Sequence, residues 1–431
     1  IATLNAYEKV GDHWIKGKKT ADKTLYKTLQ FYNAITLASY FCKSYSMVIY
    51  FACKAVQLSL QRELCEHTSS ALIQFTSVVT KAKEDNAALC YRIAKNAMSL
   101  QERFDVAASI PELYLNFYGF IAWRFESFQS GIDNLRQGFE AGLSCGHASM
   151  GLHCAFLVIR NRIYSGANLN SIMKEIDYYL HILETYESEL TRNYLLIFRE
   201  TVSTLIDNGQ TTSIDATPCV GDLDDQKNKL LNSVLHNSAI RCFWLGHSDR
   251  CWYYREKCSK CMNPFDQGRV TAAVLAKFFF GLNALDLSRK NKHVNRTNEV
   301  IRVAIATLKS AAANSDWNFT NKLLLLEAEK QSLQEQHWRA IDLYDASIAS
   351  AKRSGFIHEQ GLACEKAGLY FMREQKNKEK ALEYFEQARE CYQEWGSSMK
   401  VAFIQKELDS INLTTTIGRS SIEHVRGDGG V

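Results

Sequence analysis

The densest group of possible metal ligands in the sequence lies around residue 250. Cys258 and Cys261 have the spacing of a thiolate pair that can share a zinc ion, and Cys242, His247 and Cys251 precede them. A closed zinc site needs four ligands, and no second Cys-x-x-Cys pairs with the first. The pattern is equally compatible with thiols on two packed helices. We therefore predict ordinary buried cysteines here and no bound metal.

His358 and Glu359 form a second place where chemistry could occur. A zinc protease would need another histidine four residues after His358, but Leu362 occupies that position. A phospho-acceptor histidine of a sensor kinase also often precedes a glutamate. Its helix, however, carries a dimerisation face and is followed by an ATP-binding module, and this sequence contains neither. We therefore predict a surface or capping role for His358 at the start of a helix.

The segment from Gly11 to Thr20 has the glycines and lysines of a phosphate-binding loop but not their spacing. Such a loop has four residues between its glycines and a Ser or Thr directly after Gly-Lys. Here five residues separate Gly11 from Gly17, and Lys19 stands where the hydroxyl should be. Kinase signature loops, a nucleophile elbow and a dinucleotide fingerprint are absent from the sequence as well. We therefore predict that this chain is not an enzyme and holds no cofactor.

The composition predicts an all-α protein of more than one domain or one long repeat array. The 431 residues include only three prolines, so helix interiors are almost uninterrupted. The net charge is +4, and acids and bases are interspersed, which is typical of solvated helix faces rather than of a nucleic-acid-binding surface. We expect protein partners and no nucleic acid.

Cysteine content and hydropathy bear on the location of the protein. Thirteen cysteines without regular spacing indicate reduced thiols in an intracellular, cytoplasmic protein. The apolar stretch from Ala34 to Leu60 is broken by Lys43 and Lys54, too soon for a span of about 20 residues, so we expect no membrane insertion. The sequence shows no signal peptide and begins at Ile1, and we expect it to be a segment of a larger protein.

Apolar periodicity divides the chain into two helical regions. We expect a helical repeat array over 1–207, a linker rich in Gly, Thr and Asp at 208–225, repeats over 226–411, and a disordered tail or linker at 412–431. Within the first region, Pro111 is expected to open a helical segment that reaches Gly146.

A helical hairpin pattern occurs twice near the C-terminus, in Leu323–Gly355 and Ala363–Gly396. Each copy has a small residue, an aromatic residue four positions later and another small residue three positions after that. This spacing keeps the three side chains on one helix face, where a neighbouring helix can approach closely. The offset between the copies is 41 residues, longer than the period of about 34 of a tetratricopeptide repeat. The signature predicts a tetratricopeptide-like α-solenoid, and its residues are Ala340, Tyr344, Ser347, Ala381, Phe385 and Ala388.

Four segments together resemble the helical repeat region of large multi-domain signal-transduction ATPases and kinases, of the multi-sensor histidine kinase type. They are Tyr118–Gly146, Pro218–His247, Asn318–Phe371 and Ala381–Leu408. In that family a kinase-like domain and an AAA-type (STAND) ATPase precede the helical region, and sensor and output domains follow it. Those modules are missing from this chain, so the resemblance assigns neither ATP hydrolysis nor phosphotransfer to it.

The resemblance implies a non-catalytic arm that senses or couples, in contact with the flanking ATPase and kinase modules or with protein partners. An alternative is a constitutive tetratricopeptide-type scaffold or adaptor without a switching role. A zinc-dependent enzyme is a distant third reading.

Overall fold

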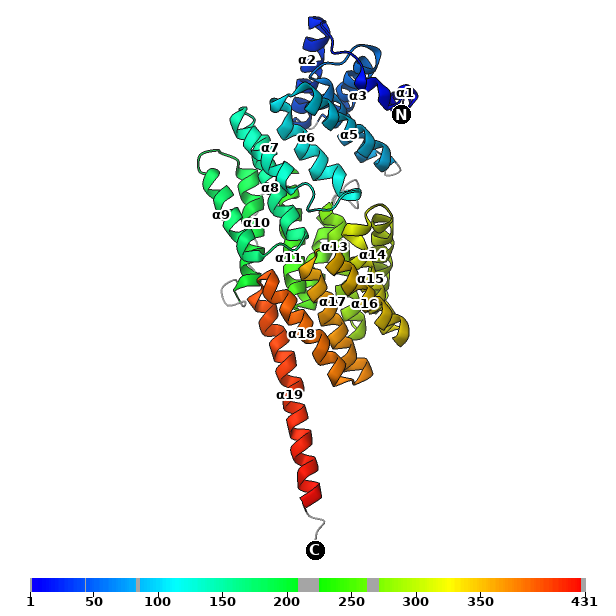
Figure 1. Cartoon of the computed structure of the whole chain (residues 1–431), viewed down its shortest axis with the longest axis vertical. Coiled ribbons are helices and arrows are strands. Elements are labelled where there is room, and N and C mark those ends of the chain that lie inside the picture. The colour runs from blue at the N-terminus through cyan, green and yellow to red at the C-terminus, as the bar shows by residue number, and fades with distance from the viewer. Residues whose placement is uncertain (1, 43, 83–85, 208–224, 262–270, 428–431) are drawn as a thin grey trace. The chain divides into compact units, whose positions relative to one another are not determined.

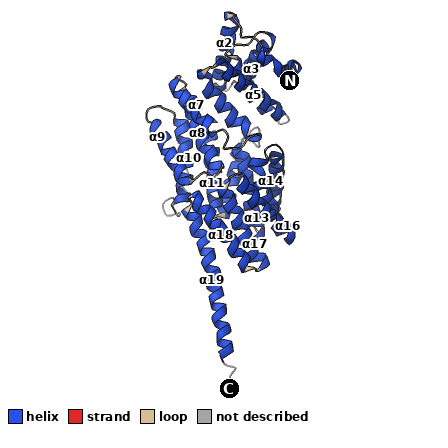
Figure 2. Cartoon of the chain, viewed as in Figure 1, coloured by secondary structure: helices blue, strands red, loops and turns tan. Residues whose placement is uncertain are grey.

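The chain is all-α. The computed structural model describes residues 2–42, 44–82, 86–207, 225–261 and 271–427. Within these ranges the backbone forms helices, a few short 3-10 and π-helical turns and one isolated bridge between Lys19 and Leu64, and it contains no strand (Figure 2). Successive helices pack against one another as antiparallel neighbours (Figure 1). The predicted fold class, an all-α helical repeat array, is therefore confirmed.

The helices fall into two compact units that interleave along the sequence. Unit 1 comprises Ile1–Asn161, Leu183–Thr191 and Asn263–Thr271, and unit 2 comprises Arg162–Ile182, Arg192–Met262 and Ala272–Val431. The sequence predicted two helical regions joined by a linker at 208–225. That linker lies outside the described residues apart from its last position, so its character stays a prediction.

Unit 1 is built from the first helices of the chain. They are α1 (Ala2–Val10), η1 (Asp12–Lys16), α2 (Lys23–Phe41), α3 (Tyr45–Gln61), α4 (Thr68–Ala82), α5 (Ala87–Phe104), η3 (Ala107–Ser109), α6 (Ile110–Asn116), η4 (Phe117–Ile121), η5 (Ala122–Arg124), α7 (Ile132–Ser144) and most of α8 (Ala148–Tyr164).

Unit 2 contains most of the remaining helices, including both copies of the repeat. They are α9 (Leu169–Ile182), α10 (Glu189–Ile206), α11 (Asp225–Trp244), α12 (Ser248–Cys261), α13 (Thr271–Arg289), α14 (Val294–Asn314), α15 (Asp316–Leu333), α16 (His337–Arg353), α17 (Ile357–Tyr370), η6 (Phe371–Gln375), α18 (Lys378–Trp395) and α19 (Ser398–Gly427). The backbone of 412–427, for which the sequence predicted a disordered tail or linker, continues α19 as helix.

The helical segment expected from Pro111 to Gly146 is interrupted. Its first part ends in a π-helical and a 3-10 turn, and the chain then reverses before α7 begins at Ile132. At the reversal Gly131 lies beneath the ring of Tyr118, where an added Cβ would be 2.3 Å from Cδ1. Only a residue without a side chain fits this close approach, and the uninterrupted apolar pattern concealed it.

Local sequence determines where the repeat helices end. Asn377 accepts a hydrogen bond from the Lys380 amide at 3.0 Å and caps the start of α18. Gly355 and Gly396, the last residues of the two copies, have φ of 72° and 87°. This left-handed conformation terminates a helix and is readily adopted by glycine. Each copy therefore ends where a glycine turns the chain into the next helix.

In the α17–α18 hairpin, glycines on one helix pack against aromatic rings on the other. Gly361 and Gly368 lie seven residues apart on one face of α17, opposite the rings of Tyr392 and Phe385 on α18. An added Cβ would stand 2.9 Å from Cε1 of Tyr392 at Gly361, and 2.7 Å from Cε1 of Phe385 at Gly368. Both rings are fully buried. The two glycines thus provide the space that the aromatic side chains fill.

One helix in the described ranges, α13, is long and apolar enough to cross a membrane, judged by length and composition. Of its most apolar window, 72% is buried inside the protein. A core helix of a helical array has the same composition, and this degree of burial favours that interpretation.

We expect Gly368→Ala to destabilise the protein, because its methyl group would press on the Phe385 ring in a packed core. The free energy of unfolding should fall by about 1–3 kcal/mol, measured by urea denaturation. Glu386→Ala, on the exposed face of α18, serves as a control and should be nearly silent. Adding Phe385→Leu to Gly368→Ala should make room for the methyl group. The double variant should therefore lose less free energy of unfolding than the sum of the losses of the two single variants. Strict additivity would contradict the packing described.

Candidate functional site

The six signature residues lie inside the two hairpins. Ala340, Tyr344 and Ser347 belong to α16, and Ala381, Phe385 and Ala388 belong to α18; all are at most 2% exposed. Their burial agrees with what the spacing predicts. They join helices to one another, as where Ser347 Oγ donates to the Asn321 carbonyl at 2.8 Å. Because they are inaccessible, they cannot themselves contact a partner.

Buried ion pairs link the helices α13, α15, α17 and α19, each to the next. They are Arg289 Nη1–Glu329 Oε2 at 2.5 Å, Lys322 Nζ–Glu359 Oε2 at 2.7 Å and Lys400 Nζ–Glu365 Oε2 at 2.6 Å. We call these three pairs the ion-pair ladder. Every rung joins two helices that are separated in sequence by another helix, so the ladder runs across successive hairpins of unit 2.

Hydrogen bonds from neighbouring side chains complete each rung. Tyr344 donates to Glu329 Oε1 at 2.5 Å, and Tyr392 donates to Glu365 Oε2 at 2.6 Å. In the middle rung, the Lys322 ammonium also donates to the Asn318 carbonyl at 2.7 Å. The buried charges therefore have the partners that make their burial tolerable.

The pKa values of the rung residues reflect competition between burial and the partner charge. Burial acts to raise the pKa of Glu329, but Arg289, Lys366, Tyr344 and Arg373 together outweigh it, and the pKa lies below its ordinary value. Burial lowers the pKa of both Lys322 and Lys400, against the opposing effect of their glutamates. Burial, followed by the neighbouring Glu329, raises the pKa of Tyr344, which stays a hydrogen-bond donor.

His358 is buried, which corrects the surface or capping role predicted for it. Its side chain is surrounded by aromatic rings, with ring centroids 5.4 Å from Trp395 and 6.3 Å from Trp244 and Phe356. Burial lowers its pKa to about 4; Glu359 opposes this effect and Lys322 adds to it. No described residue forms a hydrogen bond with its Nδ1. The ring is therefore neutral at pH 7.

The buried His358 belongs to a contact between segments about 200 residues apart. Gly166, with φ of 74°, lies so close that an added Cβ would be 2.2 Å from His358 Nδ1. Asn168 Nδ2 donates to the Glu394 carbonyl at 2.9 Å, and Ser397 Oγ donates to the Leu205 carbonyl at 2.8 Å. We call this contact the closing junction, because the second repeat copy packs against residues near α9 and α10. Unit 2 is thus held together by more than contacts between sequence neighbours.

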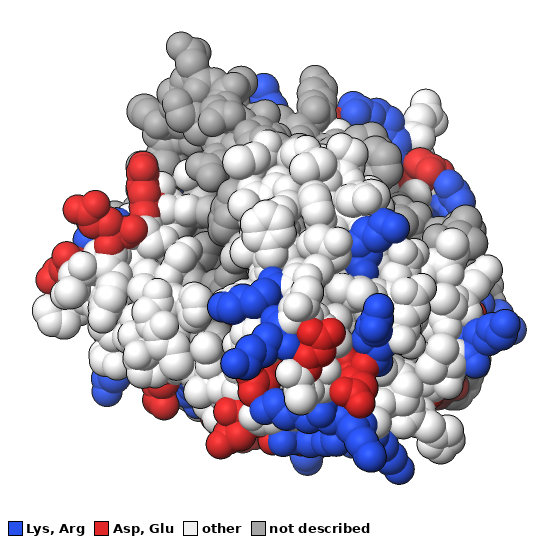
Figure 3. Space-filling model, turned by 90° about the horizontal axis from the view of Figure 1, so that it is seen from above, with Lys and Arg blue, Asp and Glu red and all other residues white. Residues whose placement is uncertain are grey.

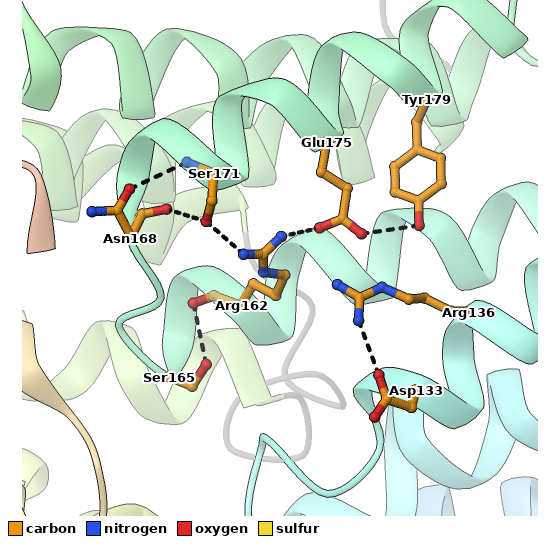
Figure 4. Close-up of polar contacts among 8 residues, drawn as sticks. All are labelled: Asp133, Arg136, Arg162, Ser165, Asn168, Ser171, Glu175 and Tyr179. Carbon is orange, nitrogen blue, oxygen red and sulfur yellow. Dashed lines mark hydrogen bonds and ion pairs between the residues drawn. The ribbon is translucent and has the colours of Figure 1, made fainter.

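A polar network fixes the turn that carries Gly166 and Asn168 (Figure 4). The Arg162 guanidinium pairs with Glu175 and donates to Ser171 Oγ at 2.6 Å. Asn168 Oδ1 accepts from the Ser171 amide at 3.3 Å, which caps α9. The arginine and the cap together hold the turn in the conformation that the closing junction requires.

The structure describes most of the cysteine cluster and the whole segment Gly11–Thr20. Cys242, Cys251 and Cys258 are buried, and burial raises the pKa of the Cys251 thiol; the side chain of Cys261 lies outside the described residues. In the segment Gly11–Thr20, residues 12–16 form a 3-10 helix. A 3-10 helix between α1 and α2 differs from the strand–loop–helix context of a phosphate loop.

The sequence did not predict the ion-pair ladder or the closing junction. Lys322 and Glu365 stand within apolar stretches of their helices, NKLLLL and LACEKAG, and a charge on an apolar face is the signal that could have revealed them. Every charged group of the ladder is paired, and all but the partly exposed Arg289 are buried. The ladder is therefore structural: it fixes how one hairpin packs on the next.

Replacing Lys322 alone with Met should leave the Glu359 carboxylate buried without its countercharge. We expect a loss of about 3–5 kcal/mol in the free energy of unfolding, measured by denaturant titration. Adding Glu359→Gln removes the orphaned charge and retains an acceptor for Asn321, so it should recover part of that loss. Arg302→Met, in an exposed pair with Glu299 on α14, should be nearly silent. If the double variant were as unstable as the sum of its singles, burial of an unpaired charge would not explain the loss.

Stability should decline in mild acid because of His358. The pKa of His358 is about 4 in the folded state and about 6.5 in the unfolded chain. Between these two pH values His358 is therefore protonated in the unfolded state but neutral in the folded state. The stabilising effect is full above pH 6.5 and is lost towards pH 4, by a few kcal/mol. His358→Gln should flatten the decline over this range in thermal melts at stepped pH. An unchanged slope in that variant would show that other groups cause the decline.

Comparison with known proteins places no further constraint on this site. No protein family matches the sequence, and no curated protein matches it either. The fold assignment rests on the structure itself, and the function has to be argued from the array and its surfaces.

Proposed function

We propose that this chain is a non-catalytic sensor and coupling arm that contacts protein partners within a larger, cytoplasmic signal-transduction ATPase or kinase. The observation that carries the proposal is the ion-pair ladder, which links α13, α15, α17 and α19 through groups that tolerate little displacement. A repeat array propagates changes through nearest-neighbour interfaces. Interfaces fixed by buried charges have discrete arrangements, because an intermediate position would leave charges unpaired.

Such discreteness is what a coupling element needs. A ligand or module can shift the array only if its free energy of interaction differs between two arrangements. Where the interfaces deform gradually, the shift is absorbed within a few hairpins. Where each interface has one paired arrangement, a displacement at one hairpin is passed to the next. The ladder therefore supports transmission towards α19.

The surface of the array supports protein partners. On the face shown in Figure 3, Lys and Arg lie among Asp and Glu, beside a broad area with few charges. In the α2–α3 hairpin, apolar side chains are 44–62% exposed at Phe31, Tyr45, Met47, Ile49 and Tyr50. An exposed apolar group of this size is typical of a contact surface.

A constitutive scaffold is the second candidate, and the closing junction favours it. Contacts between residues as far apart as Asn168 and Glu394 tie the second repeat copy to α9 and stiffen unit 2 against the bending of an open solenoid. A rigid platform would display partners without transmitting a change between them.

The two candidates differ in what happens when the ladder is neutralised in the full-length protein. Combining Lys322→Met with Glu359→Gln should leave the array folded but remove the paired arrangement at the α15–α17 interface. A coupling arm predicts that upstream ATP hydrolysis continues while the output domain no longer responds to it. The measurement is ATPase rate and output activity on the same preparation, with Arg302→Met as a control. Normal regulation in the double variant would favour the passive scaffold.

A further inference from the structure

Trp338, in the first turn of α16, is the most exposed large apolar side chain of the described residues, at 84%. The repeat does not require a tryptophan at this position. In the next copy, 41 residues later, the equivalent position is Glu379, which is also exposed. A fully hydrated indole is costly to leave in water, and tryptophan is among the residues that most often dominate protein interfaces. Trp338 is therefore accessible to a partner.

A hollow of about 430 Å³ is lined by residues of α14, α15 and α16; the three helices are labelled in Figure 1. Ile305 and Leu343 contribute its apolar lining. Asp342 also lines it and follows Trp338 by four residues, which places the two on the same face of α16. Trp338 does not itself line the hollow, but it stands one turn before a residue that does. We call Trp338 and the hollow together the α14–α16 groove.

Four charged residues line the groove: Glu327, Lys330, Arg339 and Asp342. Within the described part of the chain none of these four side chains has an ion pair or hydrogen bond. This contrasts with the ladder, where every charge is paired. Charged side chains that gather round an apolar hollow without pairing among themselves are available to an outside partner.

The charges are ordered along the groove. Lys330 lies one helical turn before the α15–α16 connection and Arg339 one turn after it, so the two bases stand at the same level. Glu327 and Asp342 lie one turn further from the connection, so the two acids share the next level. The Tyr344–Glu329 and Ser347–Asn321 hydrogen bonds fix this antiparallel register. The levels are three residues apart along each helix, which corresponds to about 4.5 Å at 1.5 Å of rise per residue.

We propose that the α14–α16 groove binds an amphipathic helix of a protein partner. The helix presents a carboxylate to Lys330 and Arg339, a basic side chain one turn away to Glu327 and Asp342, and an apolar side chain to the hollow and Trp338. A helix fits because its residues repeat with the same rise as the two levels of charge, and helices that dock in grooves use anchors one turn apart. The order of the acidic and basic levels along the groove determines which way the partner helix runs from its N-terminus to its C-terminus.

This inference deepens the proposed function by naming the chemistry of one interaction surface. The two can fail separately, because the groove is tested by binding and the coupling arm by regulated output. If a partner helix bound the groove without changing the activity of the output domain, the groove proposal would stand and the coupling-arm proposal would be wrong.

Selection from a displayed library of 20-residue helical peptides, with one face randomised, tests the groove on the whole chain. Enriched peptides should carry an acid and a base one turn apart beside an apolar residue. Trp338→Ala should weaken their binding at least tenfold, as is typical of a buried anchor. Trp317→Ala, 43% exposed at the opposite end of the hairpin, is the matched control and should leave binding unchanged.

A charge-exchanged chain supplies the decisive comparison. Combining Glu327→Lys and Asp342→Lys with Lys330→Glu and Arg339→Glu keeps the net charge and reverses the order of the two levels. Selection on this variant, with folding checked by circular dichroism, should enrich peptides with acid and base in the opposite order. The proposal is overturned if the order stays the same, if Trp338→Ala binds equally well, or if no peptide is enriched although the library displays normally.

Discussion

The burial of charge between successive hairpins is the constraint on which unit 2 depends. A lysine or carboxylate removed from water costs several kcal/mol unless its partner is in place, so each rung of the ladder permits one arrangement of its two helices. Apolar packing alone tolerates sliding, since one methyl group can replace another. Lys322 with Glu359, at 0% and 3% exposure, cannot slide without separating. Helix packing supplies most of the stability of this array, whereas the ladder makes the packing specific.

The closing junction adds a second constraint of a different kind. A repeat array bound only by neighbouring contacts gains or loses hairpins without consequence for distant ones. Here a glycine in a left-handed turn, Gly166, makes room for His358, and Ser397 reaches a carbonyl of α10. The second repeat copy is consequently bound at both faces, by α15 and α16 on one side and by the segment around α9 on the other. Such closure restricts the motion of this hairpin while leaving the α14–α16 groove open.

How far the sequence predicted this structure depends on the range of the interaction. Periodicity is local, so the helices and the buried faces of Tyr344 and Phe385 could be predicted. The helix break near Gly131 could not, because it depends on a ring that reaches back from Tyr118. His358 was misjudged since its neighbours come from four segments, and the polar pattern around it resembles a solvated helix start. The ladder was missed for the same reason, as each partner lies two helices away.

Charged residues between the hairpins are paired, whereas within the described ranges those around the α14–α16 groove are not. On the faces where hairpins meet, each buried ion finds a counterion, and three tyrosine or serine hydroxyls near them satisfy carboxylates or carbonyls. Around the α14–α16 groove two acids and two bases have no partner among the described residues, and the most exposed indole of those residues lies on the same helix as two of them. Along each helix an acid and a base three residues apart could pair, but no ion pair joins them in the described part of the chain. Across the hairpin like charges face each other, so a partner surface of opposite charge would supply the counterions that the facing helix does not.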